Sequence, residues 1–144
     1  MGTQQNRLIH GETTRQVIGA YYDVYNAFGS GFLESVYENA LMVALRRRGV
    51  EVRQQVAVDV YYDGVCVGEF RVDLLVPGKL VVEVKSIQAI GPSQDAQLIN
   101  YLKATRLPVG LILNFGATPE IRRRIAADRI IGFDPLRSVV KTNV

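Results

Sequence analysis

Two charged residues stand inside an otherwise apolar run at residues 81–85 of this chain, Val-Val-Glu-Val-Lys. Valine favours β-strands, and residues i and i+2 of a strand point to the same face. The run therefore predicts a strand on which Glu83 and Lys85 lie side by side. Burying a charge costs free energy unless the charge is paired or binds a metal, so this strand constrains the sheet that can form around it.

A second apolar strand with one acid precedes this run. Asp73 lies in the segment Arg-Val-Asp-Leu-Leu-Val, and the Pro-Gly turn at residues 77–78 separates it from Glu83. A hairpin would bring both carboxylates and the Lys85 amine together. These are the fewest functional groups that metal-dependent hydrolysis of a phosphodiester requires. From these residues alone, the alternative is a surface ion pair of Glu83 and Lys85 on the solvent face of an edge strand.

The amino-acid composition limits which metals the chain can bind. Its one cysteine, Cys66, excludes an internal disulfide and a cysteine-rich zinc site. Its one histidine, His10, lies in residues 1–12, which we expect to be a flexible leader. A metal site must therefore use oxygen ligands, which favours Mg²⁺ or Mn²⁺ over zinc.

The chain length of 144 residues suits one domain with its own core, which we expect over residues 13–144. No apolar run is long enough to span a membrane, and the polar first residues lack the apolar centre of a signal peptide. We therefore expect a cytoplasmic protein without a membrane partner. The formal net charge of +3 is compatible with a nucleic-acid partner.

Two arginine triplets stand out in the sequence. Residues 46–48 precede Gly49 and are explained by the end of a helix, where cations complement the helix dipole. No helix end explains Arg122, Arg123 and Arg124, so these three are candidates for contacts with phosphate. If they lie on a strand, Arg122 and Arg124 face one side of the sheet and Arg123 the other. A solvated run of charges is the alternative.

The spacing of apolar residues predicts the order of the helices and strands. The expected helices run from Thr13 or Thr14 to residue 28, from 33 to 48, and from 92 to 106, the last opened by Pro92. The expected strands are residues 50–62, 65–76, 79–86 and 109–115. Residues 120–125 fit either a strand or a helix, and a last short strand is expected at 138–140, after a turn at Asp134-Pro135.

The order of these elements defines a fold class. The strand at 79–86, the helix opened by Pro92 and the strand at 109–115 make a βαβ unit, so these strands should be parallel with a right-handed crossover. The strands before this unit form an antiparallel meander. We therefore expect an α/β domain whose mixed central sheet is flanked by helices.

This order, with Asp73 on one strand and Glu83-Val84-Lys85 on the next, resembles the core of the PD-(D/E)XK, or restriction-endonuclease-like, nuclease superfamily. Residues 31–37, Gly-Phe-Leu-Glu-Ser-Val-Tyr, resemble the pattern that names its GxxExxY proteins. The resemblance extends over residues 13–125 and includes the segments 61–64, 71–76 and 97–103. It implies a restriction-endonuclease-like fold and a nuclease that hydrolyses DNA phosphodiester bonds through a metal-activated water.

The same resemblance implies a role for each residue of the motif. Asp73 and Glu83 would bind Mg²⁺ or Mn²⁺, with the backbone carbonyl of Val84 as a further ligand. Lys85 would orient the attacking water and offset charge on the scissile phosphate. Glu34 would reach the metal from its helix; the alternative is an acid in a first helical turn, stabilised by the helix dipole.

Gln97 and Tyr101 are four residues apart and share one face of the predicted helix. In the family such a glutamine borders the active site, where its amide can bond a phosphate oxygen or a metal-bound water, and Tyr101 would contact the substrate. The alternative for Tyr101 is a core residue whose hydroxyl is satisfied. The family usually carries histidine in the first helix, where this chain has Tyr25.

The leading interpretation is a nuclease that acts on DNA rather than RNA. The first alternative is a nucleic-acid-binding module that keeps the fold without turnover, and the intact acid-x-Lys motif argues against it. The second alternative is a subunit of a complex, in which a homodimer mate or another protein supplies substrate recognition. The small size of the domain keeps this second alternative open.

Overall fold

The computed structural model describes residues 9–126 and 138–142. The helices within these residues are α2 (Gly11–Phe28), α3 (Glu34–Arg47) and α4 (Pro92–Thr105). The strands are β1 (Arg53–Tyr62), β2 (Val65–Val76), β3 (Leu80–Lys85), β4 (Val109–Phe115), β5 (Pro119–Ile125) and β6 (Ser138–Thr142). None of these helices is both long enough and apolar enough to cross a membrane.

The described strands form one mixed sheet in the order β5-β4-β3-β2-β1-β6. β3 and β4 pair in parallel, and every other pair of neighbours is antiparallel. A parallel pair needs a crossover connection, and α4 provides it between these two strands. The mixed sheet and the parallel β3-α4-β4 unit that the sequence predicts are therefore confirmed.

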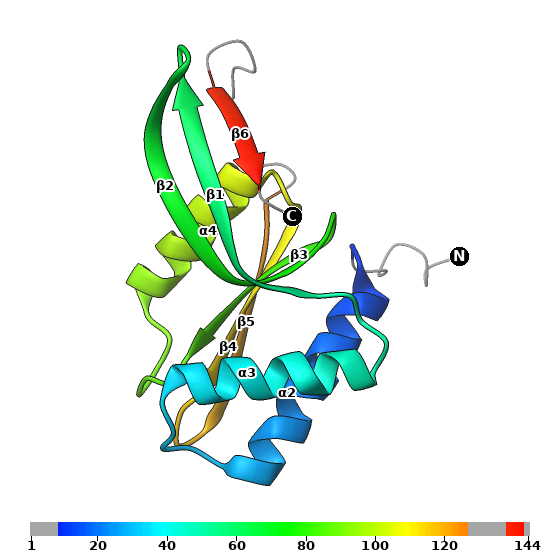
Figure 1. Cartoon of the computed structure of the whole chain (residues 1–144). Helices are drawn as coiled ribbons and strands as arrows, with labels where there is room; N and C mark the ends of the chain where they lie inside the picture. Colours follow the sequence, from blue (N-terminus) through cyan, green and yellow to red (C-terminus); the bar gives the residue numbers. More distant parts are fainter. Residues whose placement is uncertain (1–8, 127–137, 143–144) are drawn as a thin grey trace, which may run out of the picture.

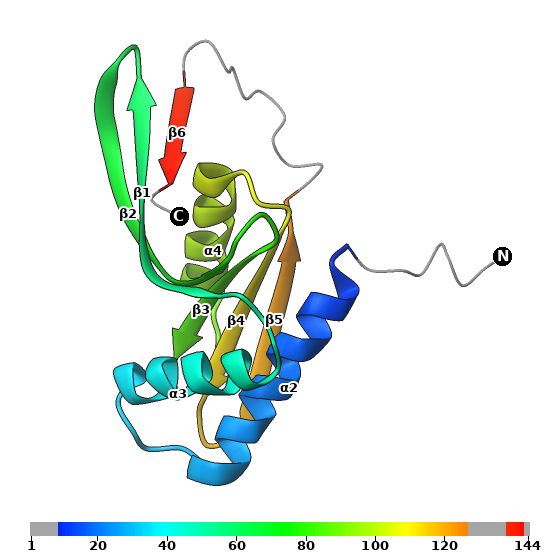
Figure 2. The ribbon, with the colours of Figure 1, turned by 45° about the vertical axis from the view of Figure 1, so that its right-hand side comes forward.

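Helices cover both faces of the sheet: α2 and α3 pack on one face and α4 on the other (Figures 1 and 2). In β3, Val82 and Val84 belong to the apolar core beneath α2 and α3, whereas Val81 belongs to the core beneath α4. Strand alternation then turns Glu83 and Lys85 towards the face that α4 covers. The two charges of the run thus point to one face of a strand that is covered on both.

β1 and β2 form a long hairpin that projects beyond the rest of the sheet, with β6 beside β1 (Figure 1). β2 pairs with β1 along nearly its whole length, but with β3 only from Leu74 to Val76. The sheet therefore opens between β2 and β3 at Asp73. Backbone groups at this opening lose their ladder partners and need others, which side chains can supply.

Two expected boundaries were wrong. The first helix begins at Gly11, after His10 with its left-handed φ of 52°, so two residues of the expected leader are helical. The first strand begins at Arg53, because Val50 still belongs to the end of α3: its N–H donates to the Leu45 carbonyl at 3.0 Å. A helix end of this kind consumes the backbone donors that a strand would need.

The C-terminal part of the chain decides one open alternative. Residues 119–125 form strand β5 rather than a helix. The last strand begins at Ser138 as expected and continues to Thr142. The predicted turn at Asp134-Pro135 and residues 1–8 of the expected leader lie outside the described residues.

Candidate active site

Asp73 and Glu83 lie opposite each other where β2 separates from β3. Leu74 pairs with Val82, and the same register continued by one residue places Asp73 opposite Glu83. The backbone hydrogen bonds between β2 and β3 end before this pair. Instead, the Asp73 N–H donates to Glu83 Oε2 at 3.0 Å, and the Val84 N–H donates to Asp73 Oδ2 at 2.8 Å. Residues directly opposite in an antiparallel pair point to the same face, so the two acids share one face of the sheet.

Burial raises the pKa of both acids, and the negative charges of neighbouring acids add to the increase. Glu83 is only 3% exposed, and its burial, followed by the charge of Asp73, raises its pKa to about 8. Burial also raises the pKa of Asp73, although the bond from the Val84 N–H opposes this. The positive charge of Lys85 lowers both pKa values without cancelling the increase. The pair would therefore gain from a further positive charge beside it.

Lys85 is joined to α4 by a chain of hydrogen bonds. Its Nζ donates to Gln97 Oε1 at 3.0 Å, and Gln97 Nε2 is 3.1 Å from the Tyr101 hydroxyl. Tyr101 is 9% exposed and packs in the core beneath α4, so it has the satisfied hydroxyl of a core residue. Burial, with the charges of Glu83 and Asp73 as smaller causes, raises its pKa. The helix face that carries Gln97 and Tyr101 thus borders the two acids.

The surface ion pair considered for Glu83 and Lys85 is wrong. Glu83 is buried, and among the residues that the structure describes no carboxylate forms a salt bridge with Lys85. Gln97 is a neutral partner and leaves the full charge on the amine. The lysine is therefore held in place without being neutralised.

Glu34, the first residue of α3, reaches the end of β3. Its Oε2 accepts a hydrogen bond from the Ser86 N–H at 3.1 Å, one residue beyond Lys85. Its side chain is exposed, and its charge contributes to the raised pKa of Asp73. Glu34 is therefore an acid in a first helical turn that lies beside the candidate site, and its contact with a metal stays a prediction.

Glu38 is an acid at this site that sequence analysis missed. It lies one helical turn after Glu34, is 8% exposed, and accepts hydrogen bonds from the side-chain amides of Gln54 and Gln55. Its charge raises the pKa of both Asp73 and Glu83. The available signal was two acids four residues apart on one helix, a spacing that destabilises an isolated helix.

Gln55 connects this acid to Asp73, and sequence analysis missed it as well. Its Nε2 is 2.8 Å from Glu38 Oε1 and 3.4 Å from Asp73 Oδ1. Its φ of 53° is left-handed, an unfavourable conformation for a residue with a side chain, and Gln55 is left out of the β1–β2 pairing between Gln54 and Val56. No local pattern in the sequence marks Gln55 as distinct from the neighbouring Gln54.

The three arginines of β5 alternate as predicted. Arg122 and Arg124 face α4, where their guanidinium groups both bond Asp95 Oδ2, at 2.8 and 3.0 Å. Arg123 faces the other side and donates to the backbone carbonyl of Ile9 at 3.0 Å. β5 is two strands away from β3, so the structure does not bring these arginines to the acids. Their contact with phosphate stays a prediction.

Tyr25 holds the turn between β4 and β5. Its hydroxyl is 2.7 Å from the carbonyl oxygen of Gly116 and 2.9 Å from that of Ala117. The ring belongs to the aromatic cluster around Phe115 beneath α2 and α3. A structural contact therefore accounts for Tyr25.

The donor set fits a hard divalent cation by its chemistry. Asp73, Glu83, Glu34 and Glu38 offer only oxygen ligands, and a cation would lower the raised pKa values of the two central acids. Within residues 9–126, however, no three acidic, histidine or cysteine side chains stand close enough to hold one ion. The backbone N–H groups of Asp73 and Val84 engage one oxygen of each central acid instead.

Comparison with known proteins agrees with this geometry. A family model described as the PD-(D/E)XK nuclease superfamily matches residues 11–125. A solved structure titled "Crystal structure of SSO0001" superposes with a TM-score of 0.53 at 14% sequence identity, covering 64% of this chain and 50% of that one. This likeness supports the fold alone, and the chain spans half the length of that protein. No curated protein matches the chain.

Proposed function

Because this chain belongs to the PD-(D/E)XK nuclease superfamily, we propose that it is a Mg²⁺- or Mn²⁺-dependent nuclease that hydrolyses DNA phosphodiester bonds. The observation that carries the proposal is the placement of Asp73, Glu83 and Lys85 on one face of the sheet at the opened β2–β3 junction, with the pKa of both acids raised. A buried acid that faces a half-buried one, beside a lysine without a salt bridge, has no evident value for stability. Perturbed pKa values of this kind cluster at functional sites.

The carboxylates supply the ligand set. Asp73 and Glu83 would hold the cation directly with the Val84 carbonyl, and Glu34 would add a ligand from α3. A bound divalent cation supplies positive charge for the phosphate oxygens and lowers the pKa of a coordinated water. Glu38, which accepts hydrogen bonds from Gln54 and Gln55, would add a further negative charge beside the metal-binding carboxylates.

Lys85 supplies the second positive charge. Its Nζ uses one of three donors for Gln97, which leaves two for the attacking water and a phosphate oxygen. Gln97 acts as a positioning residue, because it fixes the amine on the face that carries the acids. Tyr101 fixes Gln97 in turn. Substrate contact by Tyr101, Arg122, Arg123 and Arg124 remains part of the proposal.

A binding module without turnover is the second candidate, and one observation favours it. The central acids bond backbone N–H groups, and within residues 9–126 no three ligand side chains stand close enough for one ion. If those bonds persist in solution, the acids serve to close the sheet rather than to hold metal.

The test is incubation of the purified protein with labelled single- and double-stranded DNA and RNA, each with Mg²⁺, Mn²⁺ or EDTA. We expect cleavage of DNA with either metal and none with EDTA. The variant Glu83→Gln, made in parallel, controls for a contaminating nuclease. Binding of DNA without cleavage under any of these conditions would instead select the binding module.

A further inference from the structure

A basic cleft lies between α3 and β1. Its volume is about 560 Å³, and three arginines line it: Arg46 of α3, Arg53 of β1 and Arg71 of β2. No acidic residue is among its described lining residues. All three arginines are exposed. The cleft is therefore a concentration of positive charge on a protein whose formal net charge is only +3.

The cleft shares a wall with the acid cluster. Gln54 and Gln55 line the cleft, and both donate their side-chain amides to Glu38. The Arg71 guanidinium bonds the backbone carbonyl of Gln55 at 3.0 Å, while the Gln55 amide reaches Asp73 on the other side. Only Gln55 would thus separate a ligand in the cleft from Asp73, one of the candidate catalytic acids.

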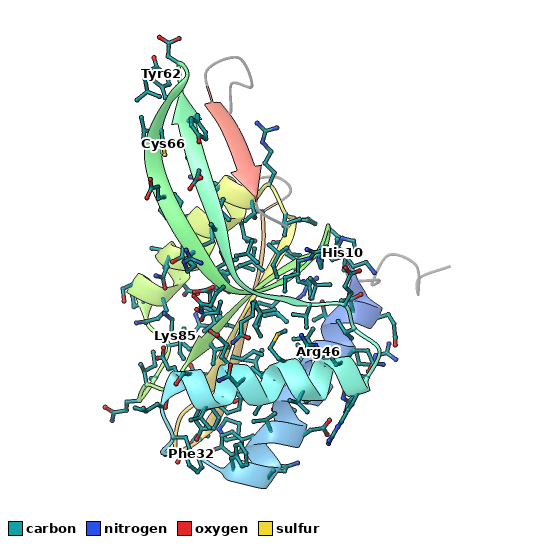
Figure 3. All side chains as sticks on the ribbon, viewed as in Figure 1. His10, Phe32, Arg46, Tyr62, Cys66 and Lys85 are labelled. Atoms are coloured by element: carbon teal, nitrogen blue, oxygen red, sulfur yellow. The ribbon has the colours of Figure 1, made fainter. Side chains whose placement is uncertain are left out.

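Helix α3 runs along both sites. Glu38, Met42 and Arg46 follow one another at a spacing of one turn, so a single stripe of the helix leads from the acids to the cleft. Glu38 and Arg46 are about 12 Å apart along the axis at 1.5 Å per residue. Figure 3 labels Lys85 near the N-terminal end of α3 and Arg46 towards its other end.

Two of the cleft arginines, Arg46 and Arg53, are available to bind an anion. The guanidinium group of Arg46 has no hydrogen bond or ion pair with another described residue. Arg53 is 3.5 Å from Glu51, in an exposed pair that contributes little to stability. Arg122 and Arg124, by contrast, already share the Asp95 carboxylate. The guanidinium groups best able to accept a new anionic partner are therefore those of the cleft.

We infer that this cleft binds the phosphodiester backbone of the substrate on one side of the scissile bond; the inference rests on the proposed nuclease function. Acids that hold a cation repel the phosphates on either side of the scissile bond. Positively charged side chains are therefore needed where those phosphates bind. Arginine suits this task because its planar guanidinium binds phosphate in a bidentate manner. At about 3.4 Å per base pair, the 12 Å along α3 from Glu38 to Arg46 corresponds to the length of roughly three to four base pairs.

The test measures the affinity for a labelled DNA duplex by fluorescence anisotropy, in EDTA, between 50 and 200 mM salt. The variants are Arg46→Gln, Arg53→Gln and the double variant. The matched control is Arg47→Gln, which removes an exposed arginine from the same turn of α3 but does not line the cleft. Arg71 is left unchanged because it bonds the strained Gln55 backbone.

We expect each single change to raise Kd roughly 3- to 10-fold at 50 mM salt and to reduce the salt slope by about one unit. The control should leave Kd and slope unchanged, and the sequence of the duplex should not matter. Cleavage under Mn²⁺, measured on the same preparations, should show a raised KM with kcat little changed.

Two outcomes overturn the inference in distinguishable ways. If the unmodified protein cleaves DNA while the cleft variants match it in Kd and slope, the cleft is not the path and the nuclease proposal stands. If the unmodified protein neither binds nor cleaves any substrate, the nuclease proposal fails and this inference fails with it. Arginine-dependent binding without cleavage would support the cleft on a binding module.

Discussion

Asp73 and Glu83 each accept a hydrogen bond from the backbone of the strand that carries the other. This reciprocal arrangement links β2 to β3 where their backbone ladder ends, and it keeps the buried Glu83 and the half-buried Asp73 on one face of the sheet. It also defines what metal binding must do, because a cation has to compete with two backbone N–H groups. The first two predictions follow from this relationship.

The stability of the metal-free protein should fall as pH rises from about 4.5 to about 8. Unfolded glutamate loses its proton near pH 4.5, whereas folded Glu83 keeps its proton up to about 8, so unfolding releases a proton between these values. The stabilisation that protonated Glu83 contributes is complete below pH 4.5 and lost above 8. The raised pKa of Asp73 changes the stability in the same direction. Urea unfolding across this range measures it, and Glu83→Gln should flatten the profile. An unmodified protein with a flat profile would contradict the burial of a protonated Glu83.

Divalent metal should raise the melting temperature of the unmodified protein. Binding to the folded state alone adds about 2.7 kcal/mol at a metal concentration 100-fold above Kd, which corresponds to several degrees for a domain of this size. Asp73→Asn should stabilise the metal-free protein, because it removes one of the repelling charges, and should abolish the response to Mn²⁺. Calorimetry with Mn²⁺ and EDTA measures both effects. A melting temperature indifferent to millimolar Mn²⁺ would favour the binding module.

Lys85→Ala should reduce turnover roughly 100-fold or more while metal binding is little weakened, since the amine acts on water and phosphate. Gln97→Ala should lower kcat by a smaller factor, because it releases the amine without removing it. The matched control is Lys103→Ala, which removes an exposed lysine from the last turn of α4. Full activity of Lys85→Ala in a purified assay would mean that the role assigned to this lysine is wrong.

Arg122→Gln combined with Arg124→Gln tests the second arginine triplet. If these residues line the DNA path, the change weakens binding for every sequence and flattens its salt dependence. It should also lower stability, because Asp95 would lose both of its partners. Asp95→Asn separates the two effects by freeing the arginines without removing them. A loss of stability with unchanged affinity would leave the triplet with a structural role.

The sequence predicted what depends on local period and turn chemistry. Alternation alone placed Glu83 and Lys85 on one face of β3, and the turn at residues 77–78 brought Asp73 opposite Glu83. The crossover through α4 followed from the order of the elements. These features need no knowledge of how helices pack on the sheet.

The features that sequence analysis missed depend on tertiary packing. Glu38 is buried through contacts of α3 with β1, where Gln54 and Gln55 bond it, and Gln55, whose backbone takes a left-handed φ of 53°, reaches two acids. The partner of Arg122 comes from α4, whose placement beside β5 no local pattern gives. Arg46 was explained by the helix end, which is correct for its position but says nothing of the cleft it lines.

The most direct test of the proposed nuclease compares Mn²⁺-dependent DNA cleavage by the unmodified protein and by Glu83→Gln, with DNA affinity measured on the same preparations. We predict that Glu83→Gln loses cleavage roughly 100-fold or more, because a ligand to the cation is removed. Its affinity for DNA should be unchanged or tighter, since one negative charge facing the phosphate has gone. Full Mn²⁺-dependent cleavage by Glu83→Gln would contradict the account.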